Sequence, residues 1–183
     1  YSQIELRLLA HIGDIPQLKK AFREGLDIHA MTASEMFDTP IEGMDPMIRR
    51  RAKAINFGIV YGISDYGLSR DLHISRKEAA SYIEEYFTRY PGVKTFLDKM
   101  VEEAHATGAV TTLFGRRREL PAIKSHNFNQ RTLAERMAMN TPIQGTAADI
   151  IKLAMIRADK ALQDAGAKSR ILLQVHDELV LEV

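Results

Sequence analysis

The sequence predicts an α+β fold, with many helices and a small amount of antiparallel sheet. Capping residues followed by apolar residues at helical spacing recur along most of the chain. Alternating apolar residues beside turn residues are confined to short stretches, the clearest of which is at residues 171–183. We therefore expect the strand-forming ends of the chain to pair into one unit, with the helices inserted between them.

Capping and breaking residues place the individual helices. Ser or Asp before an apolar run starts a helix, Glu three residues after Ser completes a capping box, and Pro or Gly ends or interrupts one. These signals predict a helix from the capping box at residues 2–5 and another from Asp45-Pro46 to about Tyr61. Two more are expected, from the capping box at residues 75–78 to about Pro91 and over residues 93–108. The last covers residues 129–165, is interrupted by Pro142 and Gly145, and is closed by Gly166.

Two segments carry strand signals. Residues 109–120 are apolar and β-branched up to a glycine and an arginine triplet, which predicts a short strand or hairpin. Residues 171–175 and 179–183 are apolar, with His176, Asp177 and Glu178 between them. This second pattern predicts a hairpin with an acidic tip.

The composition is that of an ordinary globular domain. Apolar residues make up 45% and charged residues 27%, and 25 Lys and Arg against 24 Asp and Glu give a net charge of +1. A charge so close to neutral gives no general argument for nucleic-acid binding, so such a case depends on local clusters. The chain has no cysteine, which excludes disulfides, thiolate metal sites and cysteine nucleophiles. Uncharged stretches are too short to span a bilayer.

The most informative segment is residues 49–62. Arg49, Lys53, Phe57 and Tyr61 follow one another at four-residue steps, which drift by only about 40° per step on an α-helix, so they form one stripe. Two cations and two aromatic rings on one stripe suit a nucleoside triphosphate, with its phosphates and its base. Gly58 within this helix indicates a close approach to the backbone. The alternative is a solvated basic helix end followed by core aromatics.

Asp177 is the best candidate for a metal ligand. A carboxylate on a tight turn between paired strands is a rigid oxygen ligand, and Mg²⁺ is usually held by one or two carboxylates together with substrate phosphates. The alternative is a plain turn, because Asp is common there for local hydrogen bonding.

Arg136, Asn140 and Gln144 form another polar row at four-residue steps, in otherwise apolar surroundings. Such side chains can donate to the minor-groove acceptors that all base pairs share, although an ordinary polar helix face would look the same. Pro142 is expected to bend this helix.

Other candidates carry weaker signals. The run Arg116-Arg117-Arg118 could bind phosphate or form a solvated edge, and His29 lies in the first turn of an expected helix after Asp27, a position that favours anions. Glu5 is explained as a member of its capping box. No glycine-rich phosphate loop and no H-E-x-x-H motif is present, so side chains would have to hold any phosphate.

Together these segments resemble the family A DNA polymerases. Residues 1–7, YSQIELR, resemble the family's first catalytic motif, D-Y-S-Q-I-E-L-R, without its leading Asp. Residues 49–62 match the second motif, R-x-x-x-K-x-x-x-F-G-x-x-Y-G, and residues 174–178 match the third, with its V-H-D-E core. Residues 136–145 resemble the family's R-M-x-x-N-x-P-x-Q-G helix. The resemblance runs along the whole chain in the correct order.

The resemblance implies a fragment of the right-hand polymerase fold, with mostly helical fingers inserted in a small antiparallel palm sheet. Residues 1–10 would belong to the palm, residues 11–130 to the fingers, and residues 131–183 to the palm again. The thumb, any exonuclease domain and the last palm segment would lie outside this chain. The implied activity is template-directed DNA synthesis, with release of pyrophosphate.

The resemblance also assigns roles to single residues. Arg49 and His29 would contact the outer phosphates, Lys53 would act nearer the reacting phosphorus, and Phe57 would stack on the incoming nucleotide. Tyr61 would lie at the template insertion site, close to Glu5, which would block a ribose 2′-hydroxyl. Gln3 would complete the nucleotide site. The residues expected to line the primer-template are Arg136, Asn140, Gln144, Gln174 and His176.

Two Mg²⁺ ions are implied, which would align the primer 3′-hydroxyl for in-line attack on the α-phosphate. Their ligands would be Asp177, the backbone carbonyl of Tyr1 and the Asp expected before Tyr1, with Glu178 as a further catalytic carboxylate. Because that Asp is not in this chain, we expect the isolated chain to be inactive. The expected partners are primer-template DNA and deoxynucleoside triphosphates, with no membrane, for a monomer in the bacterial cytoplasm at the nucleoid.

Two other functions remain open at this point. A helical, non-catalytic nucleic-acid-binding piece would keep the groove and nucleotide contacts without the chemistry. A polymerase that makes RNA would share the palm, but Phe57-Gly58 and Glu5 argue against it.

Overall fold

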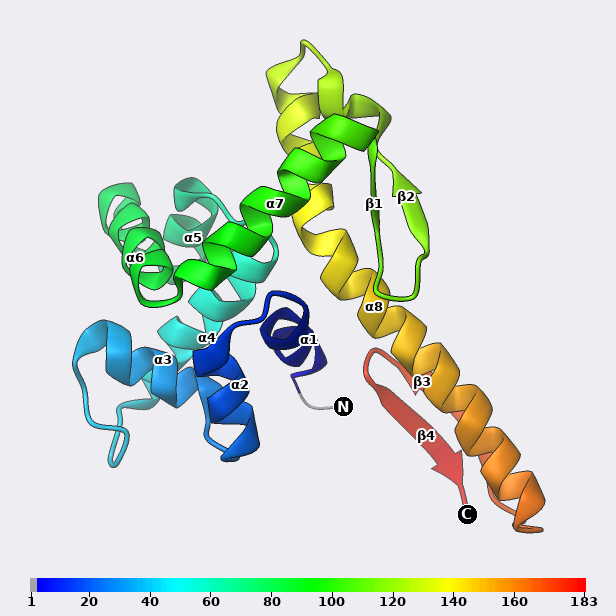
Figure 1. Ribbon diagram of the computed structural model, residues 1–183. Coiled ribbons are helices and arrows are strands. Elements are labelled where there is room, and N and C mark those ends of the chain that lie inside the picture. The colour runs from blue at the N-terminus through cyan, green and yellow to red at the C-terminus, as the bar shows by residue number, and fades with distance from the viewer. Residues whose placement is uncertain (1–2) are drawn as a thin grey trace.

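The computed structural model describes residues 3–183 as a mainly helical molecule with two short hairpins (Figure 1). The elements, in chain order, are α1 (Ile4–Ile12), α2 (Pro16–Arg23), α3 (Ile28–Phe37), α4 (Pro46–Val60), α5 (Asp65–Leu72), α6 (Arg76–Arg89), α7 (Pro91–Thr107), β1 (Ala109–Thr111), β2 (Arg117–Glu119), a 3₁₀ turn (Pro121–Lys124), α8 (Phe128–Asp164), β3 (Arg170–Val175) and β4 (Glu178–Glu182).

The predicted α+β class is confirmed, but the prediction of a single unit of sheet is wrong. The described chain begins with a helix, and its strands form two separate two-stranded antiparallel sheets, β1–β2 and β3–β4. In the second sheet the strands pair with each other, with Val175 opposite Glu178 across the turn. A hairpin satisfies its own ladder locally and needs no partner strand from the other end of the chain. The acidic tip predicted at residues 176–178 is present.

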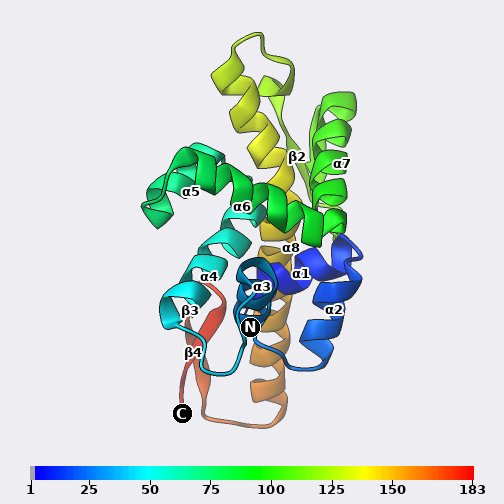
Figure 2. The same cartoon turned by 90° about the vertical axis from the view of Figure 1, so that its left-hand side faces the viewer.

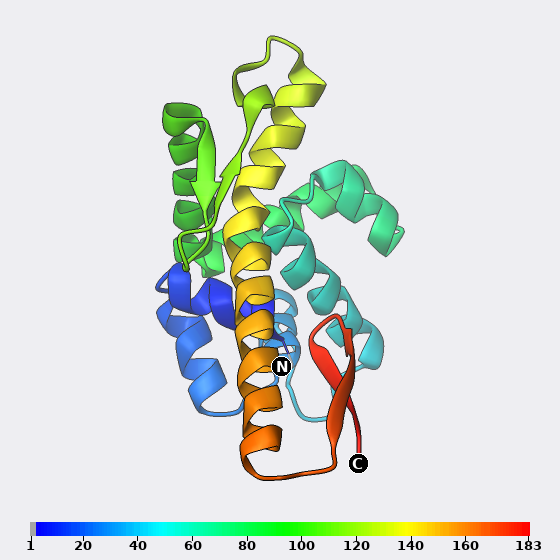
Figure 3. The ribbon, with the colours of Figure 1, turned by 90° about the vertical axis from the view of Figure 1, so that its right-hand side faces the viewer.

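Helix α8 runs the length of the molecule (Figure 3). Helices α1 and α2 lie on one side of it, and α4 and the β3–β4 hairpin lie on the other, as Figure 2 also shows. The predicted interruption at Pro142 and Gly145 is wrong, because α8 continues through both residues for 37 residues. Packing holds it on either side of the proline: Ala138 is buried in one apolar cluster and Ile143 in another.

The larger apolar cluster joins α1 to α7 and the middle of α8. Leu9, Ile55, Tyr86 and Ile143, from four different helices, are all fully buried in it. A smaller cluster beneath the β1–β2 hairpin contains Val110 and buried residues of α7 and α8. α7 and α8 therefore both contribute to the two clusters and connect them.

The two capping boxes are formed only in part. Ser75 caps α6 as predicted, with its hydroxyl accepting from the backbone N–H of Glu78 at 3.1 Å, but the Glu78 carboxylate accepts from the Tyr82 hydroxyl instead of closing the box. α1 begins at Ile4, and its N-cap is Gln3, which has a left-handed backbone and makes no side-chain cap. Ser2 of the predicted first box lies outside the described residues.

Helix α4 follows its sequence signals closely. Asp45 caps it by accepting from the backbone N–H of Met47 at 2.8 Å, and Pro46 is its first residue. It ends at Val60, before Gly62, whose φ of +65° is the left-handed conformation that stops a helix. Arg49, Lys53 and Phe57 of the stripe therefore lie on α4, and Tyr61 is the C-cap residue of the same helix.

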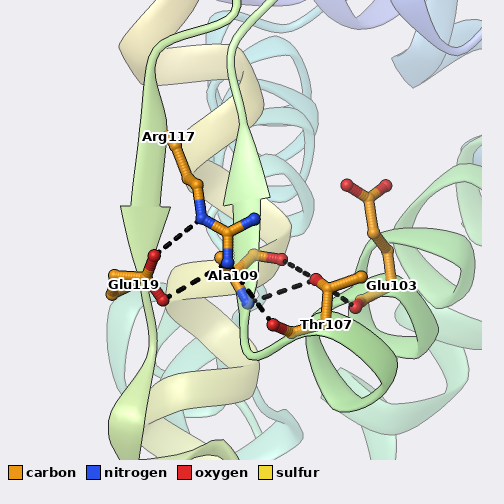
Figure 4. A network of polar contacts seen from close by, with 5 residues as sticks. All are labelled: Glu103, Thr107, Ala109, Arg117 and Glu119. Carbon is orange, nitrogen blue, oxygen red and sulfur yellow. Dashed lines mark hydrogen bonds and ion pairs between the residues drawn. The ribbon is translucent and has the colours of Figure 1, made fainter.

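The β1–β2 hairpin is attached to the end of α7 by a small polar network (Figure 4). The Thr107 hydroxyl lies 2.9 Å from the carbonyl oxygens of Glu103 and Ala109, and it is 3.3 Å from the backbone N–H of Ala109. Along strand β2, Arg117 donates from Nε to Glu119 at 2.6 Å, and its Nη2 lies 3.5 Å from the carbonyl oxygen of Thr107 at the end of α7. These contacts fix the direction in which the hairpin leaves the helix.

None of the helices within residues 3–183 combines the length and the apolar character needed to cross a bilayer.

The close approach predicted at Gly58 is made by a side chain of the chain itself. A Cβ at this position would lie 2.8 Å from Cγ2 of Ile63. Gly58→Ala should therefore lower the free energy of unfolding by about 1 kcal/mol, because an overpacking cost of about 1–3 kcal/mol exceeds the gain of about 1 kcal/mol in helix propensity. Gly92→Ala, where the nearest atom outside the helix is 3.5 Å away, is the matched control. Urea unfolding measures both, and equal stabilities would contradict this packing.

Candidate functional site

An open cavity of about 380 Å³ brings together most of the residues that the sequence motifs singled out. Its walls come from the start of α1, the end of α4, the middle of α8 and the tip of the β3–β4 hairpin. These segments are far apart in the sequence. The predicted site residues that line the cavity are Gln3, Glu5, Phe57, Tyr61, Gln144, Gln174, His176 and Asp177.

Tyr61 and Glu5 form the main polar contact in this cavity. The Tyr61 hydroxyl donates to Glu5 Oε2 at 2.5 Å and so connects the end of α4 to the first turn of α1. Burial, and then the negative charge and hydrogen bond of Glu5, raise the pKa of Tyr61 to about 12. The Glu5 carboxylate is therefore directed at Tyr61, rather than closing the capping box that its sequence position predicts.

The two cations of the α4 stripe lie outside the cavity lining. Arg49 donates from Nε to Asp27 Oδ2 at 2.7 Å, and both side chains are about 40% exposed. Burial acts to raise the pKa of Asp27, but hydrogen bonds from Arg49 and from the backbone N–H groups of Ala30 and His29 hold it below its usual range. Lys53, one turn further along α4, is exposed.

His29 is buried, whereas a side chain at an open anion-binding site would be exposed to solvent. Its side chain is only 3% exposed, and its ring lies 5.6 Å from the ring of Phe57, centroid to centroid. Burial, followed by the positive charge of Arg49, lowers the pKa of His29. The imidazole is consequently neutral at neutral pH. Its Nδ1 lies 3.1 Å from the amide nitrogen of Asn56.

The predicted DNA-contacting row on α8 is split between environments. Gln144 is exposed and lines the cavity, whereas Arg136 and Asn140 are half-buried further up the helix. The stem of Arg136 lies against the turn at Gly62, 3.5 Å from where a Cβ would be. Gln144 also lines a second cavity, of about 440 Å³, together with the three arginines at 116–118.

The arginine triplet is more ordered than a solvated edge would be. Arg116 donates to Asp149 at 2.9 Å and to the carbonyl of Gly145 at 3.0 Å, and Arg118 donates to the Thr141 hydroxyl at 3.0 Å. Two of the three guanidinium groups are thus fixed against α8. Asp149, which holds Arg116, has no motif around it that could have identified its role.

Asn56 was also missed by sequence reasoning. It is completely buried and bonded to His29 and Thr32. A single amide inside the apolar run of residues 54–60 was the available signal, because a buried polar group needs a partner.

The structure brings one of the two predicted carboxylates of the hairpin into the cavity. Asp177 lines it, and Glu178, the first residue of β4, is exposed and does not. Within residues 3–183, no three His, Asp or Glu side chains converge in a way that could hold a metal ion. The proposed carbonyl ligand of Tyr1 lies outside the described residues. Because Mg²⁺ needs only one or two protein carboxylates when substrate phosphates complete its shell, Asp177 fits part of such a site.

The sequence matches the family model for DNA polymerase family A over residues 1–183. The chain therefore belongs to this family. It is 60% identical over 182 residues to DNA polymerase I of Bacillus caldotenax, covering the whole of this chain and 21% of that protein. It is 56% identical over 185 residues to DNA polymerase I of Rhizobium leguminosarum, again over the whole chain but over 18% of the relative. The chain thus spans about a fifth of these relatives.

The fold of the chain is also similar to that of a solved structure. The polymerase domain of Pol1 from M. smegmatis, in complex with DNA primer-template and dNTP, superimposes with a TM-score of 0.96 at 51% identity, covering all of this chain and 32% of that one. The near-complete superposition supports the arrangement of helices and hairpins described above.

The Tyr61–Glu5 contact can be tested by titration. Glu5→Gln should lower the pKa of Tyr61 from about 12, because the negative charge is lost, while burial keeps it above its usual value. NMR of ¹³Cζ-labelled tyrosine measures this, and Tyr61→Phe assigns the resonance. An unchanged Tyr61 titration would show that the carboxylate does not act on the phenol.

Proposed function

We propose that this chain carries the nucleotide-adding site of a DNA-directed DNA polymerase. The enzyme would add deoxynucleotides to a primer 3′-hydroxyl on a DNA template and release pyrophosphate. The observation that carries the proposal is the single cavity in which Asp177, Glu5, Phe57 and Tyr61 meet from three distant parts of the chain. The named relatives support it, since each is a DNA polymerase I.

The incoming deoxynucleoside triphosphate would lie along α4. Its base and sugar would occupy the cavity beside Phe57, and its phosphates would extend toward Lys53 and Arg49, one and two turns nearer the start of the helix. Lys53 would neutralise charge that develops near the reacting phosphorus. Arg49 and His29 would contact the outer phosphates, and Gln3 would complete the site from the start of α1.

The primer-template would lie against α8 and the β3–β4 hairpin. Gln144, Gln174 and His176 line the cavity wall from these two elements, and Arg136 and Asn140 continue the row along α8. Donors of this kind suit minor-groove acceptors and give contact without sequence reading. Tyr61 would mark the template insertion site at the junction of this wall with α4.

Asp177 would hold Mg²⁺ together with the substrate phosphates and a second carboxylate supplied from outside residues 1–183. When bound, Mg²⁺ supplies activation of the 3′-hydroxyl and stabilises charge on the phosphate. Asp177, at the hairpin turn, lines the same cavity as Phe57 and Tyr61 at the end of α4. Glu178, outside the cavity lining, would add a second and weaker electrostatic attraction for the Mg²⁺.

In terms of domains, residues 1–10 and 131–183 would form part of the palm and residues 11–130 the fingers. The parent protein would act as a monomer in the bacterial cytoplasm, in association with the nucleoid.

The catalytic role of Asp177 is tested in the full-length polymerase. Loss of a residue that only supports a metal ligand costs roughly 10–100-fold in activity. Asp177→Asn removes the proposed ligand itself, so the rate of single-turnover nucleotide addition should fall by more than that. Duplex affinity should change little, because one carboxylate contributes little to holding DNA. Glu178→Gln, outside the cavity lining, should cost less. A loss of duplex binding equal to the loss of rate would favour the alternative of a non-catalytic binding function.

Sugar selection provides a second test. Glu5→Ala should improve acceptance of ribonucleotides at least about tenfold, because the shortened side chain leaves room for a 2′-hydroxyl. Tyr61→Phe is the matched control, since it removes the same hydrogen bond but leaves the Glu5 carboxylate in place. Competition between ribo- and deoxynucleotides measures the ratio. Equal ratios in Glu5→Ala and the unaltered enzyme would show that Glu5 does not face the sugar.

A further inference from the structure

A buried polar cluster connects α3 to α4 directly behind the proposed phosphate contacts. Asn56 is fully buried, with 0% exposure, although its neighbours in α4 are apolar. Its amide nitrogen lies 3.0 Å from the Thr32 hydroxyl and 3.1 Å from Nδ1 of His29. Thr32 is also completely buried. Three polar side chains thus satisfy one another inside the apolar contact between two helices.

The hydrogen bonds within this cluster have a defined direction. The Thr32 hydroxyl lies 2.8 Å from the carbonyl oxygen of Ile28 and 3.3 Å from Oδ1 of Asn56. Because a hydroxyl has one proton, the shorter contact with Ile28 takes it, and the hydroxyl is left to accept from the NH₂ group of Asn56 at 3.0 Å. The amide of Asn56 must then present its NH₂ group to Thr32, and the second proton of that group points to His29. His29 Nδ1 is consequently an acceptor.

This direction decides where the proton of His29 lies. In a neutral imidazole whose Nδ1 accepts, the proton is on Nε2. Among residues 3–183, the Tyr86 hydroxyl is the one side-chain polar atom that is closed off from solvent and has no hydrogen-bond partner. Nε2 of His29 is not such an atom, and no side chain or backbone group of these residues bonds to it, so it is in contact with solvent. The charged groups that act on the ring are Asp27, Arg49 and Lys53, and burial and the two cations keep the ring neutral.

We propose that Asn56 is a positioning residue that holds His29 in the tautomer with its proton on Nε2, so that His29 donates a hydrogen bond to a phosphate oxygen of the incoming nucleotide. The proposal rests on the proposed function. It explains why a histidine beside Arg49 and Lys53 can contact phosphate without being charged. A ring of the opposite tautomer would present a lone pair to the phosphate and repel it.

Replacing the amide by a carboxylate reverses the hydrogen bond and gives a test with a distinctive pH dependence. In Asn56→Asp, the carboxylate accepts from His29 Nδ1–H and raises the pKa of His29. Below that raised pKa the imidazolium donates from both nitrogens, and KM for the nucleotide stays near its unaltered value. Above it the ring is neutral with its lone pair on Nε2, and KM rises about tenfold, the loss of one hydrogen bond to a charged group.

The measurement is KM for a deoxynucleotide in the full-length polymerase across neutral pH, expressed as the ratio of variant to unaltered enzyme. This ratio cancels the titration of the triphosphate itself. For Asn56→Ala, which no longer holds the tautomer of His29, the expected ratio is above 1 and independent of pH. For Asn56→Asp the expected ratio rises with pH. Introduced into a His29→Gln background, neither change should alter KM further, because both act through His29.

The controls separate positioning from simple support of the helix contact. Thr32→Ser keeps the hydroxyl and should leave KM unchanged. An Asn56→Asp effect that is independent of pH, or that persists with Gln at position 29, would overturn the inference while leaving the proposed function intact. If Asn56→Asp does not fold, KM is compared between Asn56→Ala, His29→Gln and the double variant. An Asn56→Ala effect on KM that persists with Gln at position 29 would overturn the inference. Failure of the unaltered enzyme to extend a primer would instead contradict the proposed function.

Discussion

The burial of Ile143 and Ala147 of α8 against the α1 and α4 helices is the contact on which the cavity depends. Both residues belong to the same apolar cluster as Leu9 and Ile59, and Ala147 also lines the cavity. On the same cavity wall, the Tyr61 hydroxyl at the end of α4 donates to Glu5 of α1. Because β3 and β4 follow directly from the end of α8, the position of this helix also sets where the hairpin tip lies.

A second close approach fixes the other end of the site. A Cβ on Gly145 would lie 2.6 Å from Cγ2 of Thr112, so only glycine lets the β1–β2 hairpin pack directly on α8 there. The Thr112 hydroxyl then donates to Asp149 at 2.8 Å, and the same carboxylate holds Arg116. A glycine in the middle of a long helix thus has a packing role that its helix propensity opposes.

The parts of the structure that could be predicted from sequence are those encoded by local spacing. The α4 stripe and the hairpin tip with Asp177 follow from periodicity and turn residues, because each is formed within a single element. The position of Glu5 beside Tyr61 was predicted by family resemblance alone, since no local pattern relates residues 56 positions apart. The continuity of α8 through Pro142 was missed because tertiary packing on both sides of the proline outweighs its local cost.

In the proposed function, the distribution of ion pairs explains how a chain of net charge +1 would present cations to a polyanion. Arg49 and Asp27 form a pair in which both side chains are about 40% exposed, and such pairs contribute only about 0–1 kcal/mol. Arg49 can therefore exchange Asp27 for a phosphate at little cost. Arg116 differs, because its partner Asp149 is only 13% exposed and the Gly145 carbonyl accepts a second hydrogen bond from it. In the proposed function, Arg49 is thus a cation that can change partners with each nucleotide, whereas Arg116 is a fixed charge beside the path of the duplex.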